Sequence, residues 1–162
     1  MDTPFIYKYQ PKTINDFYIN NDLLNLLNNL ISINNLNILL IGNYGSGKTS
    51  LIKVLINTYY DNKVNDDDIL NINTIKEPGI TYYRTNVKHF CQTKCSIKGK
   101  KKFLILDDID IVNEQSQQVF RIYIDKYSNN INFIASCNNL QKVIKSIQSR
   151  LITAVLNNLE NK

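Results

Sequence analysis

The sequence predicts an α/β fold in three layers, with a five-stranded parallel sheet covered by helices on both faces. Short apolar runs alternate along the chain with segments whose apolar residues recur at helical spacing. A glycine-rich loop separates the first apolar run from a helical segment, and two acids follow a later run. Alternating strands and helices are typical of parallel sheets, whose two faces are both buried.

The five predicted strands are short, apolar and therefore buried. They cover residues 37–41, 69–73, 102–108, 131–136 and 152–156. Ligands bind parallel sheets of this kind at the carboxyl ends of the strands. The glycine loop, the acids after "FLIL" and the asparagine after "FIASC" all fall at that edge, so three separate segments predict one site there.

Four segments carry helical periodicity. The first has Leu23–Ile31 after a cap-like Asn-Asn-Asp, the second follows the glycine loop, and the others cover residues 80–90 and 115–126. In the last of these the residues predicted to face inward are Val119, Phe120, Tyr123 and Ile124.

Composition and charge exclude some classes of function. Of 162 residues, 43% are hydrophobic and 20% charged, as in ordinary globular proteins. The chain has neither a secretory signal nor the roughly 20-residue apolar stretch of a membrane-spanning helix, so we expect an intracellular protein that is not secreted and has no membrane partner. A net charge of +5 indicates either a polyanionic partner or a solvated basic surface.

The stretch "GNYGSGKT" fits the phosphate-loop spacing G-x-x-x-x-G-K-[ST] and lies between a predicted strand and a predicted helix, as such a loop must. Backbone N–H groups of the loop and the start of the following helix would hold phosphate oxygens. Lys48 would reach the β- and γ-phosphates and Thr49 would hold Mg²⁺, whereas a chance match is the alternative. The expected nucleotide-binding residues here are Gly42, Asn43, Tyr44, Gly45, Ser46, Gly47, Lys48, Thr49 and Ser50.

The acids after the strand at 102–108 suit phosphoryl transfer. Asp107 is placed to hold the metal with Thr49, and Asp108 to orient or deprotonate an attacking water. The alternative is that both acids only solvate the end of a strand. Their distance from a phosphate loop favours function.

With these motifs in place, the chain resembles the small subunits of replication factor C, the AAA+ sliding-clamp loader, over nearly its whole length. The matching stretches occur in the family's order: "YKYQPKTINDF", "GNYGSGKT" (Walker A), "LILDDID" (Walker B), "QQVFRIYIDKYSNNINFIASCN" (through sensor 1) and "IQSRL" (the Ser-Arg-Cys box). The resemblance implies a P-loop NTPase fold of the AAA+, RecA-like type. It implies an ATP- and Mg²⁺-dependent ATPase that joins other clamp-loader subunits, as a hetero-oligomeric pentamer, to load a sliding clamp onto primed DNA at a nuclear or cytoplasmic replication site.

Further roles follow from the resemblance, position by position. Asn138 would be sensor 1, which polarises water or reads the γ-phosphate, and Arg150 would be an arginine finger acting on a neighbouring subunit's nucleotide. Tyr9 and Pro11 would lie near the adenine. The expected DNA-contacting residues are Arg84, Lys88 and Arg121, and the alternative is a solvated helix face. The segment after Walker B would face the clamp, with Ile111 and Val112 either as exposed anchors or, equally, as core residues.

The chain also departs from the family. Asp108 stands where Glu is usual, which predicts slow hydrolysis, and Gln10 replaces an arginine. The family's helical lid and collar are expected to be absent, which leaves an ATPase core over residues 1–162, with an N-terminal segment over 1–20 and a nucleotide-binding domain over 21–162. Two alternatives stay open: another AAA+ replication initiator or helicase loader, and a scaffold subunit that binds ATP without hydrolysing it.

Overall fold

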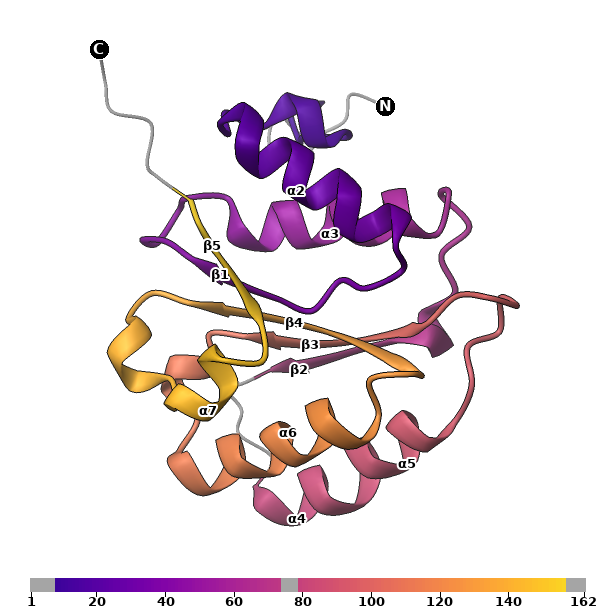
Figure 1. The fold of residues 1–162 in the computed structure, drawn as a ribbon, viewed down its shortest axis with the longest axis vertical. Helices are drawn as coiled ribbons and strands as arrows, with labels where there is room; N and C mark the ends of the chain where they lie inside the picture. Colours follow the sequence, from indigo (N-terminus) through magenta and orange to yellow (C-terminus); the bar gives the residue numbers. More distant parts are fainter. Residues whose placement is uncertain (1–7, 74–78, 157–162) are drawn as a thin grey trace.

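The protein forms one sheet of five parallel strands (Figure 1), seen here in a computed structural model that describes residues 8–73 and 79–156. The strands are β1 (Ile38–Ile41), β2 (Ile69–Asn73), β3 (Lys102–Asp107), β4 (Ile131–Cys137) and β5 (Ile152–Val155). Their order across the sheet is β2-β3-β4-β1-β5, and each neighbouring pair is parallel. The predicted fold class is confirmed, and every predicted strand is present to within one residue at either end.

Helices cover both faces of the sheet and complete the three layers. On one face lie α2 (Asn21–Ser32) and α3 (Lys48–Tyr59), whereas α4 (Ile80–Tyr82), α5 (Lys88–Gln92), α6 (Glu114–Lys126) and α7 (Lys145–Gln148) lie on the other (Figure 1). Helix α2 begins where the sequence predicts, because the side chain of Asn20 accepts a hydrogen bond from the backbone N–H of Leu23 at 2.9 Å.

The sheet divides the apolar interior into two clusters because successive side chains of a strand point to opposite faces. Along β3, Leu104 and Leu106 pack with the α6 side, whereas Phe103 and Ile105 pack with the α3 side. All four predicted inward residues of α6 are buried, so that prediction is confirmed.

The helix predicted over residues 80–90 is interrupted. Its central turn, Tyr83–Val87, is π-helical and joins α4 to α5. Tyr83 and Val87 are fully buried, while Arg84 and Lys88 are exposed on the opposite side of the same segment. The extra residue in a π turn is a feature that apolar periodicity does not encode.

A buried glutamine joins α6 to the loops around it. Gln117 donates from Nε2 to the carbonyl oxygens of Ile109 (3.3 Å), Val112 (2.9 Å) and Lys142 (2.9 Å), and its Oε1 accepts from the N–H of Ile144 (2.9 Å). The segments after β3 and β4 are thereby tied to one helix, beside the carboxyl edge of the sheet. Within the described residues, no helix is long and apolar enough to cross a lipid bilayer.

Candidate functional site: a nucleotide and magnesium site at the sheet edge

The phosphate loop leaves β1 and runs directly into α3. A Cβ atom on Gly42 would lie 2.6 Å from the Ser46 hydroxyl and 2.9 Å from the carbonyl oxygen of Leu156, so no side chain fits there. Gly47 has a φ of 87°, in the left-handed region that side chains rarely adopt. These two glycines let the backbone curl tightly before the first turn of the helix, which is the shape that presents N–H groups to an anion.

Lys48 is buried and joins this loop to the end of β4. Its Nζ donates to the carbonyl oxygens of Gly42 (2.7 Å) and Asn43 (2.9 Å) and to Oδ1 of Asn138 (2.8 Å). All three N–H donors of the ammonium group are used, and they hold it at the edge of the sheet. Lys48 and Asn138, 90 residues apart in sequence, are therefore direct neighbours.

Two oxygen atoms meet beside this lysine. The Thr49 hydroxyl donates to Oδ2 of Asp107 at 2.9 Å, and the second carboxylate oxygen, Oδ1, accepts from the hydroxyl of Ser136. Mg²⁺ prefers hard oxygen ligands, one or two from protein and the rest from water and phosphate. The Thr49–Asp107 pair fits that requirement, and the sequence had assigned the metal to the same two residues.

Asp108 has an unusual backbone and a perturbed carboxyl group. Its φ and ψ are 57° and 50°, in the left-handed region, which few residues other than glycine, asparagine and aspartate occupy. Burial raises the pKa of its carboxyl group, and the negative charges of Asp107 and Asp110 raise it further. Asn138 donates from Nδ2 to Oδ1 of Asp108 at 3.4 Å. A raised pKa makes this carboxylate a better proton acceptor.

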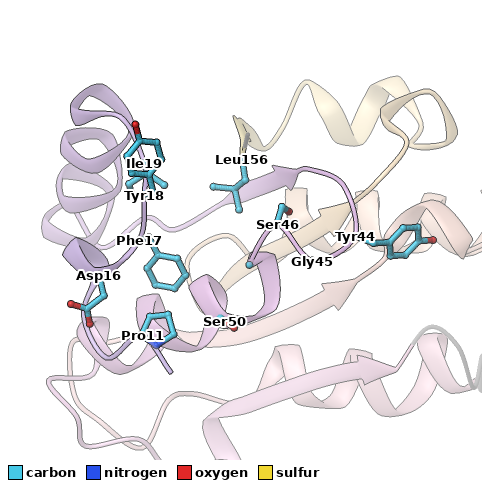
Figure 2. A pocket seen from close by; sticks show the side chains of 11 residues that line it. Pro11, Asp16, Phe17, Tyr18, Ile19, Tyr44, Gly45, Ser46, Ser50 and Leu156 are labelled. Atoms are coloured by element: carbon cyan, nitrogen blue, oxygen red, sulfur yellow. The ribbon is translucent and has the colours of Figure 1, made fainter. Parts of the chain in front are cut away.

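A cavity of about 480 Å³ lies between the phosphate loop and the N-terminal segment (Figure 2). Pro11, predicted to lie near the base, lines it, whereas Tyr9 is 66% exposed and is not part of the lining. Ser46 and Ser50 reach it from the loop and from α3. The residues that sequence reasoning did not assign to this cavity are Asp16, Phe17, Tyr18, Ile19 and Leu156.

Three of the cavity residues that sequence reasoning did not assign are consecutive in the chain. Phe17, Tyr18 and Ile19 form the connection into α2, and the Phe17 ring lies within 3.7 Å of where a Cβ on Gly47 would be. The aromatic and apolar run "FYI" directly after "PKTIND" is the signal that could have found them. Tyr44 lies at the tip of the loop, is 80% exposed, and points away from Phe17 (Figure 2).

Arg150 lies on the opposite face of the sheet from α3. It follows α7 and donates from Nε to Oδ1 of Asp125 at 2.6 Å and from Nη1 to the carbonyl oxygen of Ser146 at 2.7 Å. These bonds direct its guanidinium group along α6 and α7. Its neighbours are therefore not the phosphate-loop residues of the same chain, as a residue that serves a neighbouring subunit requires.

The three basic residues expected to contact DNA differ in their surroundings. Arg84 and Lys88 are exposed, one helical turn apart. Arg121 is half-buried, donates from Nε to Oε1 of Gln118 at 2.9 Å, and lies 3.6 Å from Asp125. Arg84 and Lys88 thus form the exposed basic pair, and Arg121 is held by neighbours on its own helix.

The two apolar residues after Walker B point in different directions. Ile111, in the 3-10 turn Ile109–Ile111, is 53% exposed, whereas Val112 is 4% exposed and packs in the core. Only Ile111 is therefore available to a partner. Val112 belongs to the apolar interior, in which Ile109 is also buried.

Comparison with known proteins shows the family to which this chain belongs. The sequence model of the ATPase family associated with various cellular activities (AAA) matches residues 38–158. The chain is 33% identical over 148 residues to human replication factor C subunit 5, covering 91% of the chain and 44% of that protein. It is 32% identical over 151 residues to the replication factor C small subunit of Methanococcus maripaludis, covering 93% of the chain and 48% of that protein. The chain thus spans less than half the length of these relatives.

Solved structures share the fold at lower identity. A DNA polymerase III gamma subunit-related protein of Thermotoga maritima superposes with a TM-score of 0.68 at 18% identity, over 83% of this chain and 46% of that chain. A RuvB variant of the same organism gives 0.65 at 14% identity, over 93% and 48%. At these identities the likeness concerns the fold alone. Because the family model covers most of the sequence, the chain belongs to the AAA family of ATPases, and within it the chain is a homologue of the replication factor C small subunits.

Proposed function

We propose that this chain binds ATP with Mg²⁺ and hydrolyses it as the ATPase domain of a clamp-loader small subunit. The observation that carries the proposal is the contact of 2.8 Å between Lys48 Nζ and Asn138 Oδ1. It joins a phosphate-binding loop to the residue expected to sense the γ-phosphate, beside two carboxylates. Residues from β1, β3 and β4 thus meet at one edge of the sheet, where parallel α/β sheets bind their ligands.

The expected mechanism is positioning and charge stabilisation. Loop N–H groups and the Lys48 ammonium would hold the phosphate oxygens, and Thr49 with Asp107 would hold a metal ion, which would supply positive charge there. Asp108, whose carboxyl pKa is raised by burial, accepts a proton from water or orients it. Asn138 contacts Lys48 through Oδ1 at 2.8 Å and Asp108 through Nδ2 at 3.4 Å, so it lies between the two charged groups.

The cavity beside Phe17 is proposed to take the base of the nucleotide. It is large enough for a small ligand, and it combines an aromatic ring, Pro11 and Leu156 with polar groups of the phosphate loop. Its position next to the loop means that one nucleotide could place its base there and its phosphates on α3.

The proposed partners are related subunits, a sliding clamp and primed DNA, since the chain is a homologue of replication factor C small subunits. Arg150 would act as a finger on the next subunit, because its own hydrogen bonds lie across the sheet from α3. Ile111, exposed beside the Walker B segment, would be an apolar anchor for the clamp. Arg84 and Lys88 would contact the phosphate backbone of DNA without reading sequence.

The test of nucleotide binding is calorimetry with ATP and magnesium on the purified chain. Lys48→Ala should lower the affinity at least about 10²-fold, because it removes a charged phosphate ligand, about 3 kcal/mol of binding. The matched control is Lys53→Ala, an exposed lysine on the same helix, which should bind like the parent. A parent that gives no heat with millimolar nucleotide would refute the proposal.

A second measurement distinguishes a subunit that hydrolyses ATP from a scaffold subunit that only binds it. Turnover of the parent and of Lys48→Ala is compared in the presence of related subunits, clamp and primed DNA. Equal background rates for the two proteins, together with normal binding by the parent, would leave ATP as a structural ligand. A rate for the parent well above that of Lys48→Ala supports hydrolysis.

A further inference from the structure

The loops that follow β3 and β4 are tied to each other in both directions. Ser136, fully buried near the end of β4, accepts a hydrogen bond at 3.0 Å from the backbone N–H of Asp108, which lies after β3. The same hydroxyl donates its proton to the carboxylate of Asp107. A serine hydroxyl has one proton to give, so both contacts together fix its orientation.

Asp110, in the segment after β3, makes hydrogen bonds in the opposite direction, to the segment at the end of β4. Its Oδ2 accepts from the backbone N–H of Asn138 at 3.2 Å and from that of Asn139 at 3.0 Å. Its other oxygen, Oδ1, is buried and has no hydrogen-bond partner among the described residues. A carboxylate is costly at such a position, because a buried oxygen without a partner loses its hydration. Packing alone therefore does not explain why an acid stands here.

We propose that Ser136 and Asp110 are positioning residues that hold Asp108 and Asn138 in register for water activation. The inference deepens the proposed ATPase function and depends on it for its catalytic meaning. Ser136 on β4 holds Asp108 in position by accepting from its backbone N–H, and Asp110 after β3 holds Asn138 in the same way. Each loop is thus held by a side chain of the other, and neither residue is among those proposed to bind the nucleotide.

Two features indicate that these hydrogen bonds to the backbone, rather than the side-chain contact between Asn138 and Asp108, keep the two residues in place. Asp108 occupies the left-handed region, which relaxes toward ordinary conformations unless its surroundings hold it. The direct contact between Asn138 Nδ2 and Asp108 Oδ1 is long, at 3.4 Å, and too weak to fix their separation. The ties at 3.0 to 3.2 Å are shorter and involve the main chain.

The test uses Ser136→Ala, Asp110→Ala and Asp110→Asn. Ser136→Ala removes the hydrogen bonds of one hydroxyl to the Asp108 N–H and the Asp107 carboxylate, and Asp110→Ala removes those to the N–H groups of Asn138 and Asn139. Asp110→Asn keeps an oxygen that can accept from the same two N–H groups. The control is Ser116→Ala, because Ser116 is equally buried on α6 and its hydroxyl has no hydrogen-bond partner among the described residues. It reports the effect of removing a buried hydroxyl without breaking a tie.

Steady-state kinetics with ATP and magnesium provide the first readout. Ser136→Ala and Asp110→Ala should lower kcat by about 10- to 100-fold, since a displacement near 1 Å has effects of this order. For Asp110→Ala, KM and the ATP dissociation constant should stay within about twofold, because Lys48, Asp107 and the phosphate loop are unchanged. Asp110→Asn should recover most of the loss, and Ser116→Ala should behave as the parent. Equal rates for all variants, or equal losses in kcat and affinity, overturn the proposal.

Amide hydrogen exchange provides a second readout that needs no turnover. In the parent, the N–H groups of Asp108, Asn138 and Asn139 should exchange slowly. Ser136→Ala should speed exchange at Asp108, and Asp110→Ala at Asn138 and Asn139, with the rest of the sheet unchanged. If these amides exchange as in the parent, the ties do not hold the loops and the proposal fails. A parent that binds no nucleotide removes the proposed function, but exchange still decides whether the ties exist.

Discussion

Arg150 and Asp125 are joined by a hydrogen bond of 2.6 Å from Nε to Oδ1, across 25 residues of sequence. The other oxygen of the same carboxylate lies 3.6 Å from Nη1 of Arg121. One acid on α6 therefore neutralises both the arginine proposed to serve a neighbouring ATP site and one expected to contact DNA. The two arginines contact different oxygens of this carboxylate at the same time, Arg150 at the shorter distance.

Arg150→Ala should raise the pKa of Asp125. The hydrogen bond from Arg150, aided by the charges of Arg150 and Arg121, holds that pKa below its ordinary value. Without the bond it should return toward the ordinary Asp value of about 3.9. A titration of the Asp125 carboxyl carbon by NMR measures the change, and Arg121→Ala, which removes the longer contact, should produce a smaller one.

The same pair predicts a pH dependence of stability. Because folding lowers the pKa of Asp125, the pair stabilises the native state above the ordinary Asp pKa, and this contribution is lost as the pH falls through the lowered value. The side chain of Asp125 is half-exposed, so we expect less than about 1 kcal/mol. Urea unfolding of the parent and Asp125→Asn should differ at pH 7 and converge once the pH falls below the lowered pKa of Asp125. A difference that persists in acid would rule out the ion pair as its source.

Arg150→Ala should also distinguish action on the same subunit from action on a neighbour. In the isolated chain, ATP affinity and basal turnover should match the parent, since Arg150 bonds across the sheet from its own phosphate loop. In an assembly with related subunits, turnover should fall on the order of 10³-fold, the usual effect of losing an arginine finger. Lys145→Ala, an exposed cation on α7, is the control. An equal loss in the isolated chain would contradict action on a neighbour.

The double variant Arg84→Ala, Lys88→Ala should weaken DNA binding in a salt-dependent way. Each exposed cation that neutralises a phosphate contributes about 1 to the slope of log affinity against log salt, so the slope should fall by about 2. Fluorescence anisotropy with primed DNA between about 50 and 200 mM salt covers the range over which such contacts differ. The control removes the same charge from the other face of the molecule, as Lys53→Ala with Lys63→Ala. A slope that both double variants lower equally would indicate net charge rather than contact.

Gln117→Ala should destabilise the fold by about 3 kcal/mol, because it leaves three backbone carbonyls and one N–H without their buried partner. Urea unfolding with an unchanged m-value measures this loss. Gln115→Ala, at an exposed position of the same helix, should change stability by less than about 0.5 kcal/mol. If the two variants are equally stable, the hydrogen bonds of Gln117 do not support the fold.

Much of the architecture could be predicted because apolar patterns reflect burial. The run "ILNIN" is β2 at its predicted ends, and the inward face of α6 is the one that periodicity gave. Spacing also located the glycine loop and the acids, since the edge of a parallel sheet gathers strand ends that are distant in sequence. Lys48 and Asn138 are neighbours for that reason.

What the sequence left open depends on tertiary structure. Asp108 has a left-handed backbone and its N–H bonds to Ser136 on another strand, and nothing adjacent in sequence indicates either feature. Ile111 and Val112 are similar in type and adjacent, so only the 3-10 turn decides that one is exposed and the other buried. The π turn within the helix over residues 80–90 likewise arises from packing rather than from periodicity.

The position of β1 within the sheet has a consequence for local unfolding of the protein. It is flanked by β4 and β5, with every residue from Ile38 to Ile41 paired on both sides. Partial unfolding of globular proteins starts at margins with few contacts. Fraying of β2, at the far margin of the sheet, would therefore leave the base of the phosphate loop intact.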